Sequence, residues 1–172
     1  GLAGTTAFLR HATNTPVYLA TVRPGAVQNA STSIYMLGFS AATGVSANYA
    51  TDAQDGCFFV ASSTKANWQA VCRSTTATIV DTGVASSTVT TGDSAWRQFR
   101  IDMIGGPTPY AVFRIKQSAS ASWGPPVATI ATTMPTAVSL NPITSVGKVS
   151  AGLSPELHIN RIRVWYNDPL WY

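Results

Sequence analysis

Nine short runs rich in β-branched and aromatic residues follow one another along this chain, separated by Gly, Pro, Asn, Asp, Ser and Thr. Runs of this length and composition predict β-strands, and the residues between them favour turns. No segment shows a convincing helical pattern. Regular short strands predict an all-β protein, an antiparallel β-sandwich or jelly roll. The runs cover residues 32–40, 56–61, 68–73, 76–80, 96–104, 110–117, 127–132, 144–150 and 157–166.

The length of the chain bounds its domain organisation. A chain of 172 residues fits one domain, and one domain of this size can bury a complete core. We expect residues 31–172 to form a single sandwich domain with an aromatic C-terminal tail. We expect residues 1–30 to be an N-terminal extension or linker that joins the sandwich.

Charged residues are scarce, at 10% of the chain against roughly 25% in an ordinary soluble domain. Aromatic and β-branched residues are too plentiful for a disordered chain, and no run approaches the roughly 18 apolar residues of a membrane helix. A dense assembly or an extracellular setting fits the neutral surface that this composition predicts. The net charge of +4 does not indicate nucleic-acid binding, because the 11 Lys and Arg residues are spread along the chain.

Strand alternation nevertheless brings several basic residues together. In residues 96–104, Phe99, Ile101 and Met103 share one face and Arg100 lies on the other. Arginine offers a planar fork to carboxylates and stacks on aromatic rings, so a face rich in arginine fits an acidic glycan or a neighbouring subunit. The alternative is an ordinary solvated sheet face. If the last long strands share a sheet, this face carries Arg100, Arg114, Lys116, Arg161, Arg163 and Trp165.

The two cysteines occupy facing positions in a predicted hairpin. Residues 56–61 and 68–73 flank the polar connection 62–67, and a hairpin centred there places Cys57 opposite Cys72. Opposed Cβ atoms lie about 4.5–5.5 Å apart in a ladder, compared with about 3.8 Å in a disulfide. The pair is therefore either a disulfide, as in an extracellular protein, or two small reduced core residues. Zinc is not expected, because no second Cys or His pair supplies further ligands.

The sequence shows no catalytic constellation. His11 and His158 carry no recognisable motif, and no nucleophile elbow or phosphate-binding loop is present. Glycoside hydrolysis needs two facing carboxyl groups, and no pair of acids has strand-alternating spacing. Asp52 and Asp55 fit a calcium loop or an ordinary Asx turn. We expect no catalytic residues, no metal, no cofactor and no enzymatic activity. The acids are Asp52, Asp55, Asp81, Asp93, Asp102, Glu156 and Asp168.

The last eight residues contain Trp165, Tyr166, Trp171 and Tyr172. Aromatic residues are favoured anchors in interfaces, and terminal segments stay ordered when they are tied down. We expect Trp171 and Tyr172 to seal the edge of the sandwich or to contact another subunit. The alternative is a stacking platform for sugars.

Several short motifs follow one another in a fixed order: YMLGF at 35–39, DGCFF at 55–59, NWQAV at 67–71, DTGV at 81–84, WRQFRI at 96–101, VFRI at 112–115 and LHINRI at 157–162. This order resembles the concanavalin-like (lectin or glucanase-type) jelly-roll domains of tailed-bacteriophage virion proteins. The resemblance spans residues 34–164. It implies a protein of the virion surface, and Asn160, where such domains often hold Asp, implies that no metal ligand is carried over.

Three functions follow from these observations as expectations. The first is a structural virion protein, a tail fibre, spike or capsid-decorating module, which assembles with other virion proteins as a homo-oligomer, with a trimer favoured. Such a protein could also contact host-surface glycans. The second is a carbohydrate-binding module or adhesin of an extracellular protein. The third, a glycan hydrolase, is disfavoured by the acids available. None of the three involves nucleic acid or membrane insertion.

Overall fold

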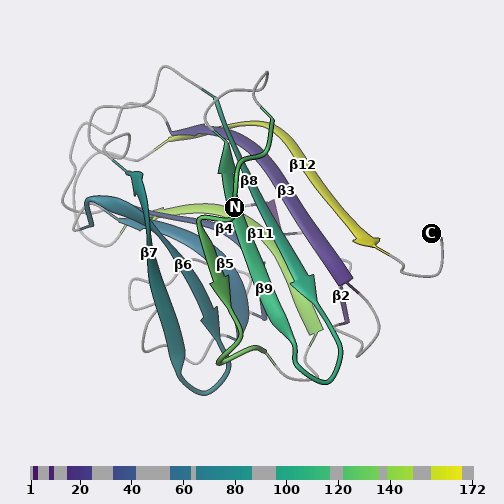
Figure 1. Ribbon diagram of the computed structural model, residues 1–172. Helices are drawn as coiled ribbons and strands as arrows, with labels where there is room; N and C mark the ends of the chain where they lie inside the picture. Colours follow the sequence, from purple (N-terminus) through teal and green to yellow (C-terminus); the bar gives the residue numbers. More distant parts are fainter. Residues whose placement is uncertain are drawn as a thin grey trace.

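The computed structural model describes residues 2–3, 8–9, 15–24, 33–41, 55–62, 65–86, 96–116, 122–135, 139–148 and 156–167. These residues form two antiparallel sheets that pack face to face, so the all-β sandwich expected from the sequence is confirmed (Figure 1). Within these ranges, no helix is long and apolar enough to cross a membrane.

The seven-stranded sheet has the order β1-β11-β4-β5-β6-β7, with β2 paired to β11, and the five-stranded sheet has the order β10-β9-β8-β3-β12. The strands of the first sheet are β1 (Leu2–Ala3), β2 (Phe8–Leu9), β4 (Ser33–Ser40), β5 (Gly56–Ser62), β6 (Asn67–Arg73), β7 (Ala77–Ala85) and β11 (Ser139–Lys148). Those of the second are β3 (Thr15–Pro24), β8 (Arg97–Ile104), β9 (Tyr110–Lys116), β10 (Ala128–Ile130) and β12 (Leu157–Asn167).

Each of the nine predicted runs overlaps an observed strand, and the three further strands all precede residue 31. The largest of them, β3, lies between β8 and β12 inside the five-stranded sheet. Residues 15–24 are therefore part of the sandwich, and not the extension or linker that the sequence analysis places over residues 1–30. Pro16 and Pro24 explain why the sequence pattern does not predict this strand, because proline usually argues against a central strand. Both lie near the ends of β3.

The strands bury a continuous aromatic core between the two sheets. Phe59 of β5 packs edge-on against Phe99 of β8 and Phe113 of β9, with ring centroids 5.2 and 5.1 Å apart. Trp68 of β6 lies over Phe99 at 4.5 Å. All four side chains are fully buried, as strand alternation requires of inward positions.

The outer faces of the two sheets differ. On the seven-stranded sheet the outward residues Met36, Phe58, Val60 and Val71 are also fully buried and form a second apolar cluster. β5 accordingly reads as an unbroken apolar run, because both of its faces are buried. The five-stranded sheet instead alternates buried and partly exposed residues along β8 and β9. The polar face available for contact therefore belongs to the five-stranded sheet.

Cys57 and Cys72 are direct partners in the β5–β6 ladder and are joined by a disulfide, with their Cα atoms 4.2 Å apart. Of the two alternatives that the sequence leaves open, the structure has the bonded form. The bond links positions 15 residues apart, for which loop-closure entropy predicts about 3 kcal/mol of stabilisation.

Candidate functional site

The register of the five-stranded sheet aligns the basic residues into rows. Arg100 lies opposite Arg114 of β9 on one side and Leu19 of β3 on the other. Leu19 in turn lies opposite Arg163 of β12. Because directly opposed residues share a face, these positions form one row across four strands. The neighbouring rows are Lys116, Gln98, Thr21 and Arg161, and Val112, Asp102, Val17 and Trp165.

Asp102 binds two arginines at the centre of this face. The Arg100 side chain donates from Nε to both carboxylate oxygens, at 3.0 and 2.9 Å, and from Nη2 at 2.6 Å. Nη1 of Arg114 donates to the same carboxylate at 3.0 Å. The Asp102 side chain is only 8% exposed and each arginine is 28% exposed, so the cluster is partly shielded from solvent. Charge-assisted bonds of this kind hold all three groups in place.

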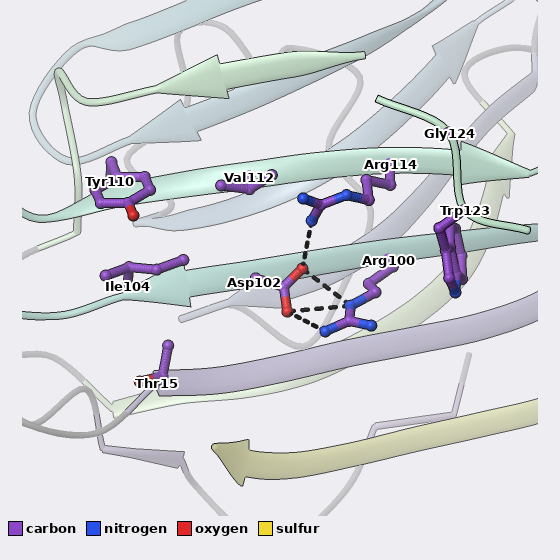
Figure 2. Close-up of a pocket in the computed structure, with 9 residues that line it drawn as sticks. All are labelled: Thr15, Arg100, Asp102, Ile104, Tyr110, Val112, Arg114, Trp123 and Gly124. Carbon is purple, nitrogen blue, oxygen red and sulfur yellow. Dashed lines mark hydrogen bonds and ion pairs between the residues drawn. The ribbon is translucent and has the colours of Figure 1, made fainter. Parts of the chain in front are cut away.

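A groove of about 580 Å³ lies over this cluster. Figure 2 shows Tyr110 and Trp123 on opposite sides of the arginine–aspartate cluster, along the direction of β8 and β9. Tyr110 is 36% exposed, which makes it one of the few large exposed hydrophobic side chains of the described part of the chain. The groove is lined by Thr15, Arg100, Asp102, Ile104, Tyr110, Val112, Arg114, Trp123 and Gly124.

Tryptophan rings lie beside basic groups on this same sheet. The Arg100 guanidinium lies 5.9 Å from the ring centre of Trp165, and Nζ of Lys116 lies 5.7 Å from that of Trp123. A cation at this distance is attracted by the negative face of the ring. Trp123 lines the groove itself, whereas Trp165 is connected to it only through Arg100.

The site residues expected from the sequence do not all line the groove. Arg100 and Arg114 line it, whereas Lys116 and Trp165 are linked to it through the ring contacts. Arg161 and Arg163 are exposed on β12, outside the lining. Trp171 and Tyr172 lie outside the described residues, as do His11, Asp52, Asp93 and Asp168.

Sequence reasoning missed Trp123, Tyr110 and the role of Asp102. Trp123 stands in the sequence Ser-Trp-Gly-Pro-Pro, directly before β10. A large aromatic among turn-forming residues has no place in a strand alternation, so this isolation was an available signal. Asp102 lies on the predicted outward face, but its link to Arg114 depends on strand register.

Asp81 lies in β7 and serves local structure. Asp81 accepts hydrogen bonds from the Gly83 backbone N–H, at 2.8 Å, and from Asn67 Nδ2, at 2.9 Å. These contacts, with the Gly83 bond the largest cause, lower the pKa of the Asp81 carboxyl. Across the described ranges, no three His, Cys, Asp or Glu side chains lie close enough to hold a metal ion.

Comparisons with known proteins identify the fold. The sequence matches no known protein family and no curated protein. A Bacillus licheniformis β-glucanase structure matches 94% of this chain and 69% of its own, with a TM-score of 0.54 and 10% identity. A Pseudomonas aeruginosa alginate lyase structure matches 92% of this chain and 67% of its own, with a TM-score of 0.50 and 12% identity. The fold is a concanavalin-like jelly roll.

These matches correct one prediction of the sequence analysis. The chain was expected not to be an enzyme, yet both matching structures are named as enzymes. The expectation rested on the absence of recognisable catalytic motifs and of a carboxylate pair, and the carboxylate pair is a criterion for glycoside hydrolysis and not for a lyase. Neither structure is named as a virion protein, so the resemblance to phage domains is supported only at the level of the jelly-roll fold.

Proposed function

We propose that the groove over Arg100, Asp102 and Arg114 binds a carbohydrate chain. Its volume of about 580 Å³ falls within the usual range of ligand sites. Tyr110 and Trp123 offer ring faces on which sugars can stack, and the charged floor between them offers groups that bind hydroxyls. The placement of two aromatic rings on either side of a hydrogen-bonding floor is the observation that carries the proposal.

The names of the structural neighbours support the same class of ligand. One is a glucanase and the other an alginate lyase, and both names refer to polysaccharides. A long ligand fits an open groove that follows two strands. A second candidate function, cleavage of the bound chain, is favoured by these names and by the presence of Tyr110 and Asp102 in the groove.

We also propose that this binding takes place outside the cell. The Cys57–Cys72 disulfide supports an extracellular location, because such bonds persist in oxidising environments. The virion surface, the partner virion proteins and the trimer stay predictions. Light scattering of the purified protein tests the trimer, and a monomer would contradict it.

Binding is tested by isothermal titration calorimetry with a panel of soluble polysaccharides that includes β-glucan and alginate. We expect Trp123→Ala and Tyr110→Ala each to weaken binding about tenfold, since a stacked ring contributes about 1.4 kcal/mol. Tyr166→Ala is the matched control, because Tyr166 is 38% exposed but lies outside the groove lining. Assays for new reducing ends and unsaturated products in the same mixtures test cleavage.

Two results would overturn the proposal. One is the absence of binding to every polysaccharide of the panel. The other is an equal loss of affinity in Tyr166→Ala and in the two groove variants, which would place binding elsewhere on the surface.

A further inference from the structure

Two guanidinium groups on the floor of the groove bind one carboxylate, and Arg100 donates more hydrogen bonds to it than Arg114 does. Arg100 directs Nε and Nη2 at both oxygens of Asp102, and its guanidinium also lies over Trp165. The Nε–Nη2 edge of the Arg100 guanidinium is therefore occupied, and its position is fixed from two sides. Arg100 and Asp102 together form a rigid support on β8.

The Arg114 side chain makes fewer hydrogen bonds than that of Arg100. It gives Asp102 a single hydrogen bond from Nη1, and among the described residues this is its one hydrogen-bond partner. A guanidinium carries five N–H donors in a planar fork, so most of its donors remain for a ligand. Its side chain is 28% exposed and lines the groove. Figure 2 shows it reaching toward Asp102 from the opposite strand, between Tyr110 and Trp123.

The charges in the cluster do not cancel. Arg100 and Arg114 are directly opposed in the β8–β9 ladder, an arrangement in which like charges repel. Asp102 neutralises only one of these two positive charges. A positive potential therefore remains over the middle of the groove. A bound anion would offset it, whereas a neutral sugar would leave it unchanged.

We infer that the ligand of this groove is an acidic sugar chain and that Arg114 binds its oxyanion, a carboxylate or a sulfate, through the unused part of its fork. This inference rests on the proposed carbohydrate binding and specifies its ligand class. Arg100 and Asp102 are positioning residues that hold Arg114 in register. Bidentate contacts between arginine and oxyanions are roughly twice as strong as neutral hydrogen bonds, so the acid group decides the preference.

The spacing along the sheet suits a chain of several sugars. Tyr110 and Arg114 lie four residues apart on β9, which corresponds to about 13 Å. Trp123 lies beyond Arg114 on the other side. An acidic unit over Arg114 thus has room for stacked neighbours toward both aromatic rings.

The test compares ligands that differ in charge: dextran against dextran sulfate, and oligogalacturonate as the carboxylate. Calorimetry on the purified chain is expected to give at least tenfold tighter binding for dextran sulfate or oligogalacturonate than for dextran. Whichever acidic ligand binds more tightly identifies the oxyanion.

Arg114→Gln is expected to remove this preference, since a charge-assisted pair contributes about 1.5–3 kcal/mol, or roughly tenfold to a hundredfold. Arg161→Gln is the matched control, because it removes one charge from the same face outside the groove.

A conservative variant guards against a folding defect. Arg114→Lys keeps the charge but lacks the planar fork, so the preference for the acidic ligand should fall without vanishing. Thermal unfolding confirms that each variant is folded. Equal affinity for dextran and both acidic ligands, or equal effects of Arg114→Gln and Arg161→Gln, would overturn the inference and leave carbohydrate binding intact. Failure of all polysaccharides to bind would overturn both.

Discussion

Single side chains connect the two sheets across the core. The Tyr18 hydroxyl of β3 shares a hydrogen bond with the Thr144 hydroxyl of β11, so one contact joins the five-stranded sheet to the seven-stranded sheet. Tyr18 is fully buried, and its ring packs edge-on against Phe39 at 5.9 Å. Burial raises the pKa of the Tyr18 phenol strongly, against the smaller opposing effect of the Thr144 hydrogen bond.

This raised pKa predicts a loss of stability in alkali. The unfolded chain ionises tyrosine above about pH 10, while the folded protein keeps the Tyr18 proton, so the stabilisation is present below about pH 10 and is lost as the pH rises further. Urea unfolding should show Tyr18→Phe to be about 1 kcal/mol less stable near neutrality and less sensitive to alkali. Tyr110→Phe, which alters an exposed tyrosine, is the control. Parallel pH curves for Tyr18→Phe and the wild type would contradict the assignment.

Residue identity predicts part of the site. Alternation along β8 and β9 places Arg100 and Arg114 on one outward face, because a period of two is a local property of a strand. The shared carboxylate of Asp102 depends on which residues face each other across β8 and β9, and this register is set by the whole sheet. The position of Trp123 beside Lys116 likewise depends on long-range packing, which the local sequence does not encode.

Glycine positions show how closely the strands approach one another. Gly38 of β4 has a φ of +151°, and a Cβ there would lie 2.5 Å from the Cys57 carbonyl oxygen and 2.7 Å from Cδ1 of Ile101. β4 thus meets its neighbour β5 and the facing strand β8 at a point where only hydrogen fits. A side chain at this position would push the two sheets apart.

Gly38→Ala is therefore expected to destabilise the fold by about 2–3 kcal/mol, through backbone strain and overpacking. Chemical denaturation monitored by tryptophan fluorescence measures the change. Gly124→Ala is the control, since no atom lies within 4 Å of a Cβ built there, and it should change stability by less than about 0.5 kcal/mol. Equal stability of the two variants would show that β4 can relax around a side chain.

Strand boundaries were predicted well where runs of Val, Ile and aromatic residues are uninterrupted, and poorly where turn-forming residues interrupt them, such as Gly83 in β7 and Pro142 in β11. β11 begins at Ser139, five residues before the predicted run. The sequence pattern did not predict this first part of the strand because it contains Pro142. β2 pairs with residues 139–140 and β1 with 143–144, so Pro142 lies between these two short partners. Proline has no backbone N–H to donate. This loss costs little on the side of β11 where no described residue pairs with Pro142.

At the scale of the whole molecule, the two sheets differ in which of their faces are buried. The seven-stranded sheet is buried on both faces along β5, whereas the five-stranded sheet buries one face and presents the groove on the other. β3 lies in the middle of this second sheet and pairs with β8 and β12 along most of its length. The groove lies mainly over β8 and β9, and β8 is paired on its other side with a strand from the first 30 residues of the chain, which also contributes Thr15 to the groove lining.

This arrangement predicts unequal effects of two N-terminal truncations. Removal of residues 1–30 deletes β3 and should abolish cooperative folding, because β12 would lose its partner in the sheet. Removal of residues 1–9 deletes only the two short strands β1 and β2 and should lower the thermal midpoint while retaining a folded sandwich. Circular dichroism with thermal melting distinguishes the two. A cooperative melt after removal of residues 1–30 would refute the central role of β3.

The sulfur atoms that bridge β5 and β6 are inaccessible to water, since Cys57 and Cys72 are both fully buried. A thiolate must reach a sulfur directly to break such a bond. Reducing agents can therefore act only on molecules whose hairpin has already opened. The rate of reduction in a reducing medium is therefore limited by how often this hairpin opens.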